Sequence, residues 1–322
     1  MITSTPLTER YAKVIEVSKR VRWEIERDVI RGRAFDYGKH FMPHGLSLVD
    51  ELPFLSNDDQ RLLSQVQGRT YAYMFGLVER FIAAKAMQLG HAHALGDQVA
   101  MQAIVRMTDE ELKHQELFRR IETMMAADMP AGYVQTADAD AVAQQVLAQS
   151  DWAVLAFTLD IELFSQAHYR ASIEPDAKIS ALWKDLFLFH WREESQHAIL
   201  DELELLREDA RLDRAQRDVA VDQLIGLVGA VDGMVQAQAA ADADYFCAIV
   251  GTAFSAAQQQ QIHALVLKAY RWQYIVSGAM EPRFQKVLFA LVDEAQGARI
   301  QTALAPLMYA VPQQKVPFPM AA

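Results

Sequence analysis

The chain carries the same arrangement of acidic and histidine residues twice, and this arrangement restricts the folds open to it. Each half has a Glu-x-x-His motif preceded by a carboxylate on an earlier apolar segment: Glu79, Glu111 and His114 in the first half, and Glu162, Glu194 and His197 in the second. In both halves the motif glutamate follows the earlier carboxylate by 32 positions, and corresponding residues are offset by 83. The halves share little other sequence, so the repeat is one of architecture.

The spacing within each motif suits a metal ion. On a helix the two side chains of Glu-x-x-His differ by about 300°, so they lie about 60° apart on one face. Four glutamates and two histidines in this arrangement are the ligand set of a carboxylate-bridged di-iron or di-manganese site inside a four-helix bundle. Oxygen-rich ligands with imidazole suit iron or manganese, whereas six ligands for two ions fit the closed tetrahedral preference of zinc poorly.

The surroundings of Glu79 predict that its carboxylate is buried. Its helical neighbours three and four positions away are apolar or glycine, and they include Phe75, Gly76 and Ile82. A buried carboxylate must be protonated, paired or bound to metal because an unpaired charge is costly. A core salt bridge to an arginine is the alternative for this residue alone, but the doubled motif favours metal.

Several residues near the motifs are candidates for hydrogen bonds to the ligands. Glu110 and Glu193 precede the motif glutamates and could accept the free N–H of a ligand histidine, the alternative being ordinary solvated charge. Asp160 lies on an even more apolar face than Glu162, but only Glu162 repeats the spacing of Glu79. We therefore expect Glu162 to be the ligand and Asp160 to support the site.

Two residues with hydroxyl groups are further candidates to lie beside the metals. Tyr71 lies two helical turns before Glu79 and could hydrogen-bond a ligand or undergo oxidation, with core packing as the alternative. Thr158 lies one turn before Glu162 and could relay protons, although a threonine that bonds back to its own helix is the common case.

His190 breaks the symmetry between the two halves. Positions 190, 194 and 197 of a helix fall at about 0°, 40° and 340°, so their side chains share one narrow stripe. The corresponding position in the first half is Met107. We expect His190 to be a third histidine ligand, the alternative being a core histidine bonded to the backbone or a carboxylate.

With this histidine, the pattern resembles the p-aminobenzoate N-oxygenase-like di-iron oxygenases of the ferritin-like superfamily. The residues that carry the resemblance are Glu79, Glu111, His114, Glu162, His190, Glu194 and His197. The resemblance implies a cofactor of two Fe ions, with Mn as an alternative, and O2 as co-substrate. It also implies an amine substrate oxidised to hydroxylamine, nitroso or nitro product, an external electron donor and a homodimer. The plain six-ligand pattern is shared with acyl-carrier-protein desaturases, aldehyde-deformylating oxygenases and ribonucleotide reductase small subunits.

The composition predicts an all-α fold. Glycine and proline number only 14 and 10 in 322 residues, and the long segments are rich in good helix formers. We expect a single ferritin-like domain over 1–322 with a core bundle at about 57–206. Its helices are predicted at 57–89, 97–128, 138–173 and 176–206. Additional helices are predicted at 8–30 and within 213–304, at 213–250, 255–280 and 282–304, followed by an extended or disordered tail at 312–322.

Charge and cysteine content narrow the function classes. The net charge of −11 and the lack of a basic stripe argue against nucleic-acid binding. The single cysteine, Cys247, excludes a disulfide framework. We see neither a secretory signal nor an apolar run near the roughly 20 residues that a membrane span needs, so we expect a cytoplasmic protein.

Three competing functions remain open at this level. The first is a different di-iron oxidation, such as hydroxylation, desaturation or deformylation of a small or acyl substrate. The second is a non-catalytic metal-binding or iron-storage protein, which the additional helices disfavour because storage needs only a short bundle. The third is a helical interaction module without metal.

Overall fold

The computed structural model describes residues 7–313 of the chain. Within these residues the structure is helical and contains no strand, apart from one isolated bridge between His40 and Ile179. The prediction of an all-α fold is therefore confirmed. The predicted tail, 312–322, lies outside the described residues except for its first two positions.

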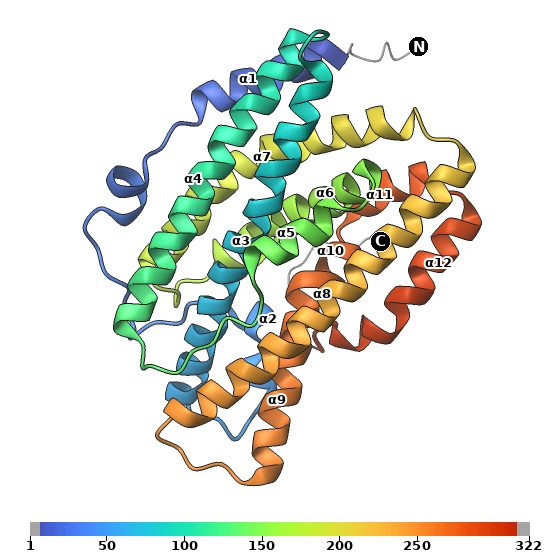
Figure 1. Cartoon of the computed structure of the whole chain (residues 1–322). Helices are drawn as coiled ribbons and strands as arrows, with labels where there is room; N and C mark the ends of the chain where they lie inside the picture. Colours follow the sequence, from blue (N-terminus) through green and yellow to red (C-terminus); the bar gives the residue numbers. More distant parts are fainter. Residues whose placement is uncertain (1–6, 314–322) are drawn as a thin grey trace.

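Five long helices dominate the fold (Figure 1): α3 (Asn57–His93), α4 (Gln98–Asp128), α6 (Asp151–His168), α7 (Ala181–Asp209) and α8 (Arg214–Ile249). The shorter helices are α1 (Leu7–Arg20), α2 (His44–Ser47), α5 (Ala139–Leu147), α9 (Ala256–Arg271), α10 (Ser277–Ala279), α11 (Pro282–Leu291) and α12 (Glu294–Leu304). Single π-helical segments follow α1, α6 and α9, at Ile25–Ile30, Tyr169–Ile173 and Trp272–Val276. Short 3-10 turns lie at Val49–Glu51 and Ala305–Ala310.

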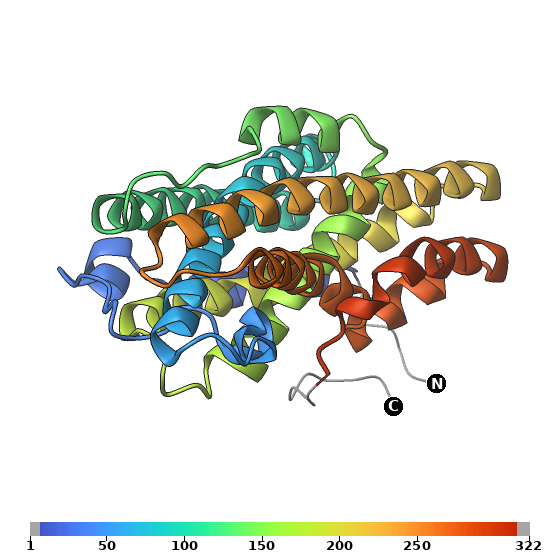
Figure 2. The same cartoon turned by 90° about the horizontal axis from the view of Figure 1, so that it is seen from below.

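Two helical pairs form the centre of the molecule. Helix α3 packs along α4, α6 packs along α7, and α4 contacts α7 between the pairs. Helix α1 lies across α4 and α7 on one side, whereas α5 and α8 cover α3 and α6 on another. Figure 2 shows α8 running along the length of the molecule beside these helices. The four central helices therefore enclose a common interior.

Capping residues set where the central helices begin. Ser56 accepts a hydrogen bond from the Asp59 backbone while Asp59 bonds back to Ser56, a capping box that starts α3. The Asp97 carboxylate accepts from the first backbone N–H groups of α4. These caps fix the axial position of each helix, and so the height at which its functional side chains enter the interior.

Several predicted helices are interrupted, because local capping competes with continuation. The helix predicted at 8–30 ends at Arg20, and an extended segment separates it from the π-helical turn. The helix predicted at 138–173 is two helices, since the Ser150 hydroxyl accepts from the Ala153 N–H and starts α6 there. The helix predicted at 282–304 is likewise broken where Asp293 caps α12.

The fourth predicted bundle helix begins later than the sequence indicated. Helix α7 starts at Ala181 rather than at 176, because the backbone before it pairs with another part of the chain. The Ser180 N–H donates to the His40 carbonyl, and the Ser180 hydroxyl accepts from the Asp36 N–H. These bonds hold 174–180 as turns.

Helix α8 is the one element of the described chain that is long and apolar enough to cross a membrane by length and composition alone. The sequence was expected to contain no apolar run near the length of a membrane span, and by this measure that expectation is wrong for α8. One such helix is weak evidence for a membrane span: 28% of its apolar window is buried, and α8 packs on α6, α9 and α12. The finding is compatible with a soluble protein.

Candidate metal centre

The seven predicted ligands converge on the interior of the four central helices. Helix α3 contributes Glu79, α4 contributes Glu111 and His114, α6 contributes Glu162, and α7 contributes His190, Glu194 and His197. None of these residues is more than 2% exposed. Six of the seven, all except Glu162, fall into two groups whose potential ligand atoms lie within 4.8 Å of one another. Each of these groups could hold a metal ion.

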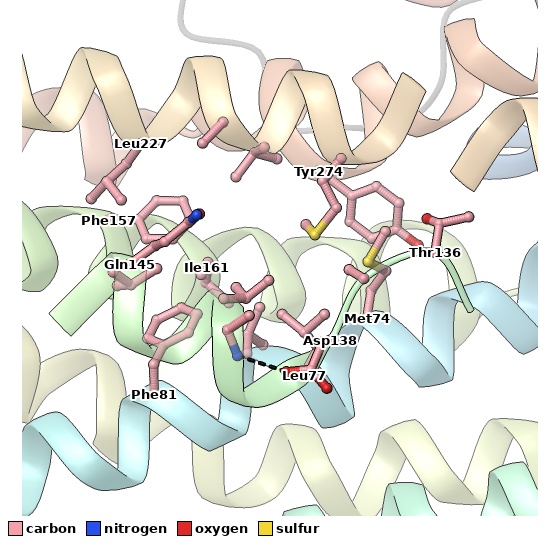
Figure 3. Close-up of a pocket in the computed structure, with 18 of the residues that line it drawn as sticks. Met74, Leu77, Phe81, Thr136, Asp138, Gln145, Phe157, Ile161, Leu227 and Tyr274 are labelled. Atoms are coloured by element: carbon pink, nitrogen blue, oxygen red, sulfur yellow. Dashed lines mark hydrogen bonds between the residues drawn. The ribbon is translucent and has the colours of Figure 1, made fainter. Parts of the chain in front are cut away.

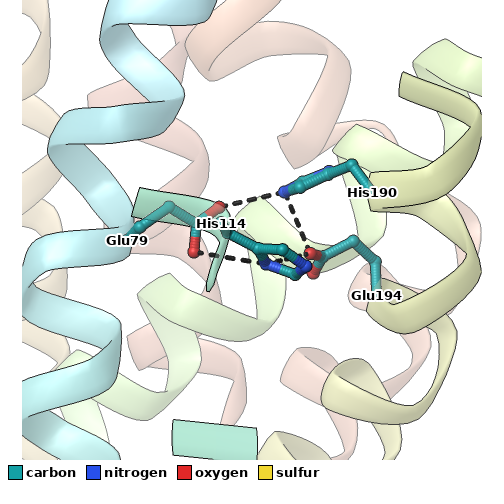
Figure 4. A group of neighbouring side chains, drawn as sticks. All are labelled: Glu79, His114, His190 and Glu194. Carbon is teal, nitrogen blue, oxygen red and sulfur yellow. Dashed lines mark hydrogen bonds and ion pairs between the residues drawn. The ribbon is translucent and has the colours of Figure 1, made fainter. Parts of the chain in front are cut away.

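The first group comprises Glu79, His114, His190 and Glu194 (Figure 4). The Nε2 atom of His190 lies 3.0 Å from Oε1 of Glu79 and 2.9 Å from Oε1 of Glu194. The Nδ1 atom of His114 lies 3.2 Å from the same oxygen of Glu194. Two carboxylates and two imidazoles from three helices thus face a common point.

The second group comprises Glu111, His114, Glu194 and His197. The Nδ1 atom of His197 lies 2.9 Å from Oε1 of Glu111 and 3.4 Å from Oε2 of Glu194. His114 and Glu194 belong to both groups, so the two groups are adjacent. Glu194 presents Oε1 to the first group and Oε2 to the second, which is the arrangement of a bridging carboxylate.

Glu162 lies beside the two groups without joining either. Burial, followed by the charge of Glu194, raises the pKa of Glu162 well above its ordinary value. Its Oε2 atom is buried and has no hydrogen-bond partner within residues 7–313. The Glu162 side chain therefore lies close to the centre. Glu79, the corresponding residue of the other half, belongs to the first group.

The hydrogen bonds predicted for Glu110 and Glu193 are present, and they cross between the halves. The Nε2 atom of His114 lies 2.9 Å from Oε2 of Glu193, and Nε2 of His197 lies 3.0 Å from Oε2 of Glu110. With Nε2 occupied, each imidazole directs Nδ1 at the centre. Such partners fix the orientation and tautomer of metal-binding histidines.

Two residues of the N-terminal segment and Lys113 of α4 support the centre, and none of them was predicted from the sequence. The Ser18 hydroxyl donates to Glu110 at 2.7 Å, and the Trp23 ring stacks on His114 at 5.9 Å between centroids. Lys113 donates to Glu193 at 2.6 Å, and its ammonium lies over the Trp23 ring. No local motif marks Ser18 or Trp23, because their roles depend on α1 and the segment after it crossing α4 and α7.

The structure does not bring Asp160 or Tyr71 to the ligands. Asp160 lies against Gly278, where an added Cβ would be only 2.5 Å from its Oδ1 and would displace the carboxylate. The Tyr71 hydroxyl is 2.7 Å from Nδ1 of His168 rather than from a ligand. The Tyr71 ring packs on Phe75 at 4.8 Å, in keeping with a core role.

Thr158 and Asp201 lie beside the centre, and Asp201 was not predicted from the sequence. Both line a small cavity of about 10 Å³, together with Ile82 and Met107. The Thr158 hydroxyl and Asp201 Oδ2 are buried and have no hydrogen-bond partner within the described chain. Burial raises the pKa of Asp201 well above its ordinary value, although the charge of His197 acts to lower it. Asp201 continues the helical stripe of the α7 ligands, which is the signal that could have identified it.

Burial and mutual charge set the protonation of the metal-free centre. Burial, and then the charge of Glu111, raises the pKa of Glu79 to about 7. Burial works against ionisation of Glu111 as well, but the charge of His197 keeps the pKa of Glu111 below its usual value. Burial also opposes the charged form of His114, but bonds to Glu111 and Glu193 hold the pKa of His114 well above its ordinary value. Protons therefore balance the carboxylates in the absence of metal.

Several polar atoms at the centre are close to one another without forming hydrogen bonds, and they fit a cation. Buried atoms that form no hydrogen bond in the described chain include Glu79 Oε2, Glu111 Oε1, Glu162 Oε2, Glu194 Oε1 and His197 Nδ1, although Glu111 Oε1 and His197 Nδ1 are only 2.9 Å apart. Native proteins rarely leave buried polar atoms unsatisfied. Here they gather at the two points where the ligand atoms converge, and divalent ions that accept oxygen and imidazole ligands would satisfy them.

We expect metal binding to release protons and to strengthen as pH rises. The raised pKa values of His114 and Glu79 mean that both bind protons at and below about pH 7 in the metal-free state, and ligands must lose them. Calorimetric titration with Mn(II) in buffers of different ionisation enthalpy measures the number released. Affinity that is unchanged between about pH 6 and pH 8, with no proton release, would contradict this assignment.

Comparison with known families and with curated proteins finds no match for this chain. The assignment of a metal centre therefore depends on the residues and their geometry.

Proposed function

We propose that this protein is a non-haem di-iron oxygenase that activates O2 and N-oxygenates an amine. The observation that carries the proposal is the pair of adjacent ligand groups that share Glu194 and His114. A carboxylate shared between two ions is the feature of ferritin-like di-iron and di-manganese proteins. The third histidine, His190, lies in the first group, in keeping with the resemblance to the p-aminobenzoate N-oxygenase-like enzymes.

The proposed reaction needs electrons as well as O2. When bound, two iron ions supply the redox chemistry for O2 reduction that amino-acid side chains lack. For the first step, an amine, O2, two electrons and two protons give a hydroxylamine and water. One oxygen atom forms the N–O bond, and the other leaves as water. Repeated turnover requires an external electron donor, which we propose is a redox protein or a small reductant.

The protein's own residues would orient the ligands, exclude water and deliver protons. Glu110 and Glu193 hold the two motif histidines with Nδ1 towards the metals. The rings of Phe75 and Phe118 each lie 5.2 Å from the His190 ring and close that side with apolar surface. Across the centre, Asp201 is held in its protonated form by burial and could donate a proton during O2 reduction.

A single-turnover experiment tests the proposal without a donor protein. The chain is loaded anaerobically with two Fe(II) per molecule, mixed with 4-aminobenzoate and exposed to O2, and products are identified by mass spectrometry. The reduced centre carries the two electrons that one oxygenation consumes, so we expect up to one hydroxylamine per centre. The same experiment with a decanoyl thioester tests hydroxylation, desaturation and deformylation.

The outcomes separate the competing functions. Oxidised acyl product without amine oxidation would replace N-oxygenation by another di-iron oxidation. Iron uptake far beyond two ions per chain, without either product, would indicate storage. Failure to bind iron after anaerobic loading would remove the enzymatic proposal altogether. Glu208→Ala removes a carboxylate of α7 that pairs with Arg211 just after the helix. It serves as the matched control and should behave as the unaltered protein.

A further inference from the structure

One ligand histidine, His114, is in contact with aromatic rings that reach the surface. The Trp23 ring stacks on the His114 ring at an interplanar angle of 10°, and Trp23 also contacts the Phe189 ring at 5.9 Å between centroids. Trp23 is buried, whereas Phe189 is only half-buried. The phenylalanine rings around His190 are instead at most 3% exposed. Phe189, Trp23 and His114 therefore form a continuous series of ring contacts from the surface to the metal centre.

Cations lie at the outer end of this series. The Lys113 ammonium is 3.9 Å from the centroid of the Trp23 ring, and the Arg192 guanidinium is 4.6 Å from the centroid of the Phe189 ring. Lys113 is paired with the buried carboxylate of Glu193. Arg192 is exposed and forms no ion pair within the described chain. Its charge is therefore available to a partner at the point where the ring contacts reach the surface.

A basic segment follows α1 along the outside of α4 and α7 (Figure 1). Residues 19–33 contain six lysines and arginines but only three acids, in a chain whose net charge is −11. Most of these charges pair with one another or with neighbouring elements. Three cations of the segment are exposed and form no ion pair within the described chain, against one such acid, Glu24. These cations, Lys19, Arg20 and Arg22, together with the exposed Arg192, define the basic patch.

The groove on another side of the molecule contains no cation among its described lining residues. It lies between α5 and α8 and the helices α3 and α6, and its lining is mainly apolar (Figure 3). The one acid among these residues, Asp138, caps α5. A negatively charged partner would meet no counter-charge there, so the basic patch is the surface that suits such a partner.

We propose that the basic patch is the docking surface for an acidic one-electron-transfer protein, and that electrons enter the metal centre through Trp23 and His114. This inference rests on the proposed oxygenase function, which needs two electrons from outside for each turnover. Each encounter transfers one electron: the donor is oxidised, one iron ion is reduced, and no bond forms or breaks. Electron-transfer complexes bury little surface, so attraction between opposite charges contributes much of their association.

Binding of an acidic donor to the whole chain tests the docking surface. The probe is an oxidised plant-type [2Fe–2S] ferredoxin, titrated by calorimetry at low and high salt into protein with and without Mn(II). We expect a complex that weakens as salt rises. Arg22→Glu combined with Arg192→Glu should weaken it at least about tenfold at low salt.

A second pair of reversals provides the matched control. Lys286→Glu with Arg299→Glu makes the same change in net charge on α11 and α12, and α12 lies at the opposite edge of Figure 1 from the segment after α1. This variant should bind the ferredoxin within about twofold of the unaltered protein, because salt screens charges far from the interface. Equal weakening in the two double variants, or no complex at low salt, would overturn the docking surface.

Reduction of the iron-loaded centre tests the path of the electrons. Reduced ferredoxin is mixed with iron(III)-loaded protein in a stopped-flow instrument, and the limiting rate at saturating ferredoxin is separated from the dissociation constant. Trp23→Leu should lower the limiting rate and leave the dissociation constant unchanged, whereas Trp23→Phe, which keeps a ring beside His114, should restore most of the rate. An unchanged limiting rate in folded, iron-loaded Trp23→Leu protein would show that electrons enter elsewhere.

These outcomes are independent of the fate of the amine. Electron transfer is followed by the absorbance of the ferredoxin, so it is measured whether or not an amine is oxidised. A centre that the ferredoxin reduces but that oxidises no amine would contradict N-oxygenation and leave the docking surface standing. Amine oxidation in the single-turnover experiment, without salt-sensitive ferredoxin binding, would contradict the docking surface and leave the oxygenase standing.

Discussion

Replacing Glu194 by alanine is expected to leave the chain unable to hold two metal ions. Glu194 is the one carboxylate common to both ligand groups, with one oxygen facing each. Altering partners that only orient ligands already costs 10–100-fold in metal affinity. Loss of the shared ligand should therefore lower affinity by more than about 100-fold at both positions. Iron per chain, measured after anaerobic loading and gel filtration, should fall from two to well below one.

The same substitution should also destabilise the metal-free protein. His190 and His197 lie within 3.4 Å of the Glu194 carboxylate and have raised pKa values, so removing it leaves buried charge uncompensated. Removing one partner of a buried ion pair costs about 3–5 kcal/mol. Helix content by circular dichroism must therefore be compared alongside metal content. A folded Glu194→Ala protein that retains two tightly bound ions would show that this carboxylate does not bridge them.

The convergence of the candidate ligands could be predicted because helical periodicity converts sequence spacing into position on a helix. Residues three, four and seven apart share a face, so His190, Glu194 and His197 had to form one stripe wherever α7 packed. Glu110 and Glu193 could be proposed as partners of the motif histidines from their place before the motif glutamates, although not that each would bond the histidine of the other half. The all-α class followed from the scarcity of glycine and proline. None of these inferences needed knowledge of which helices become neighbours.

Contacts between distant segments could not be predicted in the same way. Asp160 lies on an apolar helical face like that of Glu162, but it packs against Gly278, which is more than a hundred positions later in the chain. Tyr71 lies on the ligand helix, yet its hydroxyl is paired with His168. Ser18 and Trp23 support the centre from a segment whose path depends on where α1 ends. In each case tertiary packing, rather than local sequence, selects the partner.

His190→Ala is expected to empty one metal position and spare the other. His190 belongs only to the first group, where its Nε2 lies 3.0 Å from an oxygen of Glu79 and 2.9 Å from an oxygen of Glu194. The second group keeps Glu111, His114, Glu194 and His197 intact. Mn(II) titration followed by electron paramagnetic resonance should therefore give one tight site per chain, with the other weakened at least about tenfold.

The internal repeat supplies the control for this substitution. Met107 occupies the corresponding position in the first half and is also buried, at 3% exposure, so Met107→Ala removes core volume without removing a ligand atom. If His190 only packs, both variants should lose stability, and both should bind two ions as the unaltered protein does. If His190 is a ligand, only His190→Ala should lose the spin coupling between paired Mn(II) ions. Two coupled ions in a folded His190→Ala protein would show that His190 is not a ligand and that only the six residues of the symmetric repeat can bind the metals.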